Sequence, residues 1–133
     1  MYNKYIIPGC FFAGLAVALG AFGAHGLENI TDDDTILKGF RTGVQYQMYH
    51  ALALLITGII AERIDSVWVR RAAYSFITGI ILFSGSLYLL TFLKIQESNA
   101  VRIAGPLTPV GGLFFIAGWL FLLVAVLSQK KKS

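Results

Sequence analysis

The chain has 133 residues, the length of one domain, but its composition is far from that of a water-soluble domain. Hydrophobic residues make up 56% and charged residues 14%, whereas a soluble domain carries about a quarter charged residues. The net charge of +4 comes from short lysine and arginine clusters between apolar runs, without the basic aromatic-interleaved stripe that nucleic-acid binding needs. This composition indicates an integral membrane protein whose surroundings are a lipid bilayer, with no nucleic-acid partner.

The first apolar run covers residues 5–24, close to the roughly twenty residues that a helix needs to cross a bilayer core. Lys4 before it and the small residues after it are also typical of a secretory signal peptide. Against that interpretation, Pro8 and Gly9 interrupt the start, and three more apolar runs follow. Small residues recur along the run at helical spacing, which lets another helix approach closely. Gly26 is placed to end the helix in a left-handed conformation.

A polar and amphipathic segment follows at residues 28–42. Thr31 is placed to cap a helix whose first turn contains three aspartates, at the positive end of the helix dipole. Ile36, Leu37 and Phe40 share one face of that helix. The pattern predicts an interfacial helix that leads into the second span or is continuous with it.

Three further apolar runs predict spans at residues 44–61, 72–92 and 110–127. Trp68 lies in the charged turn before the third span, as an interfacial anchor does. Thr108 followed by Pro109 predicts an N-cap and a first helical turn for the fourth. The expected fold is all-α: a single membrane domain over residues 1–133, with four transmembrane helices in up-and-down order and an amphipathic interfacial helix before the second.

An even number of spans places both termini on the same side of the membrane. That side carries the larger number of basic residues: Lys4, Arg63, Arg70, Arg71, Lys130, Lys131 and Lys132. The opposite side carries Lys38, Arg41, Lys94 and Arg102, together with most of the acidic residues. The positive-inside rule therefore predicts that both termini are cytoplasmic.

Polar residues within the spans concentrate in the half of the bilayer away from the termini. Because polar groups are costly in hydrocarbon, they normally face the bundle interior or a wet cavity. The N-terminus of the fourth helix adds free backbone N–H groups at this level, which favour a carboxylate or phosphate headgroup. The sequence predicts a polar layer formed by His25, Gln47, His50, Ser84, Ser86, Tyr88, Thr108, Gly111 and Gly112.

Three interpretations of this layer remain open. It can bind a lipid headgroup or small amphiphile, it can join the helices through hydrogen bonds worth about 0.6–2 kcal/mol each, or it can transfer protons. No acidic residue within the spans could orient a histidine as a catalytic triad requires. Two histidines and the single Cys10 do not make a convincing metal site. The residues therefore predict no enzyme, no cofactor and no metal.

Four segments carry a resemblance to a known family: residues 20–27 (GAFGAHGL), 44–51 (VQYQMYHA), 83–88 (FSGSLY) and 105–112 (GPLTPVGG). In this order they resemble the signature segments of the DUF423 family of small bacterial inner-membrane proteins, to which a eukaryotic transmembrane protein is similar. The resemblance implies a four-span protein of a bacterial cytoplasmic membrane. It implies no established activity and no catalytic residues.

The function that these observations favour is non-enzymatic, with the polar layer in the outer half binding a lipid headgroup or small amphiphile. One alternative is a structural or assembly protein whose glycine-rich helix faces pair with a partner or a second copy. Another is a small oligomeric transporter. The absence of carboxylates within the spans argues against this last alternative, because proton relays commonly use them.

Overall fold

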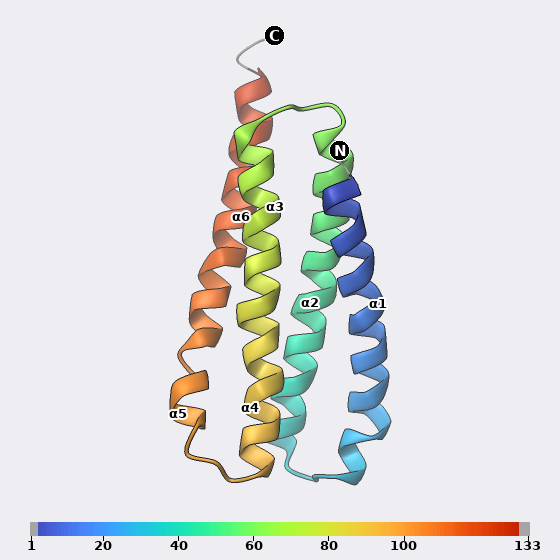
Figure 1. Cartoon of the computed structure of the whole chain (residues 1–133), viewed down its shortest axis with the longest axis vertical. Coiled ribbons are helices and arrows are strands. Elements are labelled where there is room, and N and C mark those ends of the chain that lie inside the picture. The colour runs from blue at the N-terminus through green and yellow to red at the C-terminus, as the bar shows by residue number, and fades with distance from the viewer. Residues whose placement is uncertain (1–2, 131–133) are drawn as a thin grey trace.

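A computed structural model describes residues 3–130, and in this range the chain forms helices and turns without any strand. Four long helical segments run up and down, with both ends of the chain at the same end of the bundle (Figure 1). Each segment is long and apolar enough to cross a membrane. The prediction of an all-α protein with four transmembrane helices is confirmed.

The first two segments are α1 (Asn3–His25), which continues into the short 3₁₀ turn η1 (Leu27–Asn29), and α2 (Asp34–Ala61). The third comprises α3 (Val67–Gly79), the π-helical turn η2 (Ile80–Ser84) and α4 (Gly85–Ile95). The fourth is α6 (Leu107–Lys130), preceded by the single turn α5 (Val101–Ala104). The predicted spans therefore lie within these segments, which extend beyond them at nearly every end.

The helices pair in sequence, and α2 and the third segment occupy the middle of the bundle. α1 packs mainly on α2, whereas α6 packs on α3 and η2, so α1 and α6 lie at opposite edges (Figure 1). Gly9, Ala16 and Gly23 are the small residues that α1 buries, at a regular seven-residue spacing. A Cβ at Gly23 would lie 2.9 Å from the ring of Phe40, which shows how closely α1 and α2 approach.

The amphipathic segment forms the first turns of α2, which is continuous from Asp34 to Ala61. Its apolar face is buried: Leu37 and Phe40 form a core cluster with Leu27 of η1. The predicted cap is wrong, because the helix begins three residues after Thr31. Asp33 caps it instead, and its Oδ1 accepts hydrogen bonds from the Thr35 N–H at 2.9 Å and the Thr35 hydroxyl at 2.7 Å.

The prediction of a left-handed Gly26 is also wrong. Its φ of −69° and ψ of −44° are right-handed, and the chain turns through η1, in which the Asn29 N–H donates to the Gly26 carbonyl at 3.2 Å. A Cβ at Gly26 would lie 2.7 Å from the ring of Phe22, so a larger residue here requires that ring to move. Among the described residues, positive φ occurs at Glu97, in the turn that follows α4.

Candidate functional site

Gln47 is the centre of a hydrogen-bonded link between three helices. Its side chain is buried, and its Nε2 donates to the carbonyl of Phe12 on α1 at 2.8 Å. Its Oε1 accepts from the hydroxyl of Tyr88 on α4 at 2.6 Å. An amide can donate and accept at once, so this one side chain joins α2 to a neighbour on either side.

A second set of polar contacts surrounds η2. Ser84 donates to the carbonyl of Gly43 on α2 at 2.6 Å, and Ser86 donates to the carbonyl of Phe83 at 2.9 Å. Ser86 also bonds to the hydroxyl of Thr108 on α6 at 2.5 Å. Since the single proton of Ser86 is directed to a carbonyl, Thr108 is the donor in that pair.

Thr108 therefore does not act as the N-cap that its sequence position predicts. α6 begins one residue earlier, at Leu107, so that Thr108 lies in the first turn and its hydroxyl is used for the contact with α4. Gly111, one turn further, packs directly on the third segment: a Cβ there would lie 2.3 Å from the backbone nitrogen of Phe83. At Gly112 the nearest atom would be 3.8 Å away, an ordinary contact distance.

His50 lies in an aromatic environment between α2, α3 and α6. Its Nδ1 bonds to the carbonyl of Tyr46 at 2.7 Å, and its Nε2 bonds to the indole Nε1 of Trp119 at 3.1 Å. The ring stacks on Phe115, with centroids 3.5 Å apart and planes 7° apart. A carbonyl only accepts and an indole N–H only donates, so both bonds require the neutral imidazole with its proton on Nδ1.

The predicted residues do not all belong to one group of contacts. Gln47, Tyr88, Ser84, Ser86, Thr108 and Gly111 connect neighbouring helices. His50 lies one helical turn after Gln47 on α2, roughly 4.5 Å further along, and contacts Phe76 of α3 and Trp119 of α6. His25 is the exposed last residue of α1, and within residues 3–130 no hydrogen bond joins it to the others. His25 is thus separate from this group.

The space beside His50 is a cavity of about 470 Å³ that opens on the side of the bundle between α2 and α6. The residues lining it are Tyr46, His50, Pro109, Gly112, Leu113, Phe115, Ile116 and Trp119. Only His50 and Gly112 were among the predicted site residues. Phe115 and Trp119 could have been found from their spacing with Gly112, which places all three on one face of α6. Trp119 within a span also needs a hydrogen-bond acceptor, and His50 is one.

The polar atoms of this region are satisfied by the protein itself. In the part of the chain that the structure describes, no buried side-chain nitrogen or oxygen lacks a hydrogen-bond partner. Across the same residues, no group of three or more His, Cys, Asp or Glu side chains could hold a metal ion. The hydroxyls and the amide therefore act as links between helices, and the open space lies beside the aromatic residues.

Comparison with known proteins identifies relatives over nearly the whole chain. The family described as "Protein of unknown function (DUF423)" matches residues 19–112. The "UPF0382 membrane protein YwdK" of Bacillus subtilis is 45% identical over 91% of this chain and 94% of its own length. The "UPF0382 inner membrane protein YgdD" of Escherichia coli is 39% identical over 100% of this chain and 97% of its own length. No solved structure matches the chain.

Proposed function

The chain belongs to the DUF423 family of membrane proteins, and we propose that it is a non-enzymatic binder of a lipid or small amphiphile, whose apolar chain lies in the groove beside His50. The observation that carries the proposal is the cavity of about 470 Å³ between α2 and α6, bordered by the rings of Tyr46, Phe115 and Trp119. Tyr46 and Trp119 are 39% and 47% exposed, so their rings are accessible from the surrounding lipid.

The shape of the groove favours an extended apolar chain. Along α6 it runs from Pro109 to Trp119, a rise of roughly 15 Å. Its Pro109 end lies in the first turn of α6, where the positive end of the helix dipole favours a negative group. A negative headgroup would then lie at the Pro109 end, near the positive end of the helix dipole. Its apolar chain would extend along the groove towards Trp119.

A binding role fits the chemistry of His50 better than an enzymatic one. Both of its ring nitrogens are engaged, by Tyr46 and by Trp119, and its surroundings are aromatic. Among the described residues, no carboxylate pairs with it. A general base needs a nitrogen that can take up a proton, and His50 could do so only by giving up its bond to Trp119.

The test is to fill the groove. Gly112→Leu would place a side chain in it, and Gly14→Leu is a matched control because nothing lies within 4 Å of the corresponding position on α1. The measurement is labelling of the purified protein by a diazirine-bearing phospholipid, with the labelled peptide identified by mass spectrometry. Label at residues 109–119 should fall in Gly112→Leu and persist in Gly14→Leu. Equal labelling of both variants and wild type would refute the proposal.

We also propose the inner membrane of a bacterium as the location, with both termini in the cytoplasm. The charge bias between the two ends of the bundle and the printed name of the Escherichia coli relative support this. Fluorescent-protein and alkaline-phosphatase fusions at the C-terminus provide the test. Fluorescence without phosphatase activity is expected, and the opposite pattern would reverse the orientation.

A second candidate is self-assembly through α1, favoured by its position at the edge of the bundle. Its outward face carries Gly14, with no neighbour within 4 Å, and the exposed Cys10 one turn away. Two such faces could approach closely in a homo-oligomer. Oxidative crosslinking of the native Cys10 in membranes should then give a dimer that Gly14→Leu diminishes. Monomer alone would exclude this face.

A further inference from the structure

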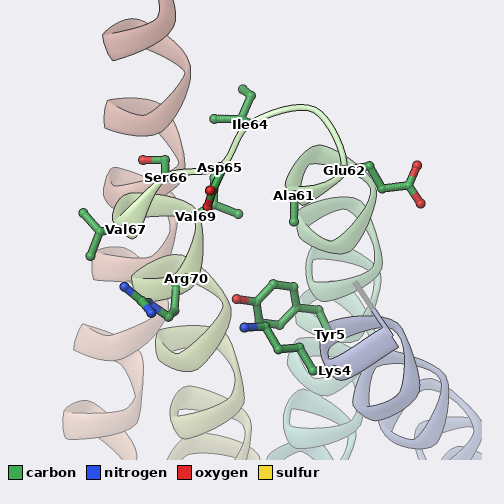
Figure 2. Close-up of a pocket in the computed structure, with 10 residues that line it drawn as sticks. All are labelled: Lys4, Tyr5, Ala61, Glu62, Ile64, Asp65, Ser66, Val67, Val69 and Arg70. Atoms are coloured by element: carbon green, nitrogen blue, oxygen red, sulfur yellow. The ribbon is translucent and has the colours of Figure 1, made fainter. Parts of the chain in front are cut away.

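A second cavity, of about 300 Å³, lies at the opposite end of the bundle, where the chain begins and ends. It is enclosed by the start of α1, the end of α2, and the loop and first turn of α3 (Figure 2). The lining residues are Lys4, Tyr5, Ala61, Glu62, Ile64, Asp65, Ser66, Val67, Val69 and Arg70. None of them lines the groove beside His50, so a ligand site here can be tested independently of the proposed function.

Tyr5 is the first indication that the cavity takes a ligand. The residue is 4% exposed, and its ring packs with Leu54 and Ala73 in the core. Its hydroxyl points into the cavity (Figure 2). Within residues 3–130 no hydrogen bond engages this hydroxyl, and because no buried side-chain oxygen there lacks a partner, the hydroxyl oxygen is accessible from the cavity. It is therefore a donor available to a molecule in the cavity.

The charges around the cavity are the second indication. Lys4 and Arg70 supply positive charge, with the Lys4 ammonium 5.0 Å from the centre of the Tyr5 ring. Asp65 supplies negative charge from the loop above, and Glu62 directs its carboxylate away (Figure 2). In the described part of the chain, the ion pair that forms is Arg41–Glu28, at the far end of the bundle. Asp65 is thus not neutralised by Lys4 or Arg70.

The third indication is an apolar groove that begins at the same arginine. Arg70 also lines a cavity of about 530 Å³ on the outer side of the bundle. The other residues of that groove come from α3 and α6: Val67, Arg71, Tyr74, Ser75, Thr78, Phe114 and Phe121. Arg71 lies over the ring of Trp68, 4.8 Å from its centre, as expected at the edge of the lipid. The groove therefore runs from the charged end of the bundle into the bilayer.

We infer that these two cavities bind one phospholipid with a primary ammonium group in its headgroup, such as phosphatidylethanolamine. The phosphate accepts from Arg70, Lys4 and the Tyr5 hydroxyl, and the ammonium donates to Asp65. One acyl chain lies in the groove between α3 and α6. An anionic headgroup without an ammonium would meet the unneutralised carboxylate of Asp65. A choline headgroup has no N–H to donate to it.

The experiment is native mass spectrometry of the full-length protein, after incubation with equimolar phosphatidylethanolamine, phosphatidylcholine and phosphatidylglycerol of identical acyl chains. Wild type should retain phosphatidylethanolamine in roughly two- to fivefold excess over each of the others, the range of exposed charge pairs. Asp65→Asn should remove its advantage over phosphatidylcholine. Tyr5→Phe should lower its retention without disturbing the core, because the buried ring is unchanged.

Arg70→Ala and Arg63→Ala form the matched pair, since Arg63 lies close by in the loop between α2 and α3 but does not line either cavity. Arg70→Ala should lower the retention of all three lipids, and Arg63→Ala should not. Thr78→Phe should obstruct the groove and speed lipid dissociation. Preference for phosphatidylglycerol, an unchanged lipid ratio in Asp65→Asn, or equal losses in the two arginine variants would each overturn the inference.

Discussion

Trp119 donates its indole N–H to Nε2 of His50 across 3.1 Å, and this contact joins α6 to α2 near the middle of the bundle. It also specifies the protonation of the histidine, because the Nδ1 proton is directed to the carbonyl of Tyr46. The two hydrogen bonds of His50 therefore require its imidazole to be neutral.

The first prediction concerns this imidazole. In ¹⁵N NMR spectra of the labelled protein, Nε2 of His50 should appear unprotonated and Nδ1 protonated at neutral pH. Trp119→Phe keeps an aromatic ring but leaves Nε2 without its donor, and should destabilise the protein by about 0.6–2 kcal/mol in thermal unfolding in detergent. A protonated Nε2 in wild type would contradict the assignment.

The second prediction concerns the link through Gln47. Tyr88→Phe removes the hydroxyl that bonds to Oε1 of the buried amide, and should cost about 1–3 kcal/mol of unfolding free energy. Gln47→Leu removes the partner and also the contact with Phe12. Because the two side chains touch, the double variant should be less destabilised than the sum of the single variants. Additive effects would show that the pair makes no net contribution.

The third prediction compares two adjacent glycines. Gly111→Ala introduces a methyl group 2.3 Å from the Phe83 backbone nitrogen, and backbone cannot move aside as a side chain can. It should destabilise the protein by about 1–3 kcal/mol or separate α6 from η2. Gly112→Ala meets its nearest atom at 3.8 Å and should be tolerated. The measurement is thermal unfolding of both variants in detergent, and equal stabilities would contradict the packing.

The spans were predictable from sequence because lipid imposes a single rule on them. A helix that crosses the hydrocarbon must be apolar for about twenty residues, and residues 5–24 and 110–127 satisfy this without reference to the rest of the chain. The same rule predicts that polar side chains within the spans face other helices. Gln47 and Ser84 do so, and they bond across helices to Tyr88 and Gly43.

The depth of each polar residue was not predictable in the same way. The second span was predicted to begin at residue 44, which would place His50 close to the membrane surface and to His25. In the structure Gly23 of α1 packs against Phe40 and Gly9 packs against Ala51, so His50 lies beside the first turns of α1 whereas His25 is its last residue. Hydropathy marks where lipid contact begins but not how far a helix extends past it. The pairing of His50 with Trp119 depends on that offset between helices.

The last prediction concerns Asp33, where the sequence indicated the wrong capping residue. Bonds from the hydroxyl and the N–H of Thr35 lower the pKa of this carboxyl below its usual value of 3.8. A carboxyl whose pKa is lower in the folded than in the unfolded state stabilises the fold above the unfolded value. The contribution of Asp33 to stability is lost as the pH falls below 3.8 and through the lower pKa of the folded state.

Asp33→Ala should therefore lower the Tm at pH 7 and flatten the decline of the Tm below pH 4. Asp33→Asn should keep the cap without that acid dependence. Thr31→Ala is the control, because its Oγ1 lies before the helix and accepts only from the Asp33 N–H at 3.2 Å. A larger fall in Tm for Thr31→Ala than for Asp33→Ala would show that Thr31 is the capping residue.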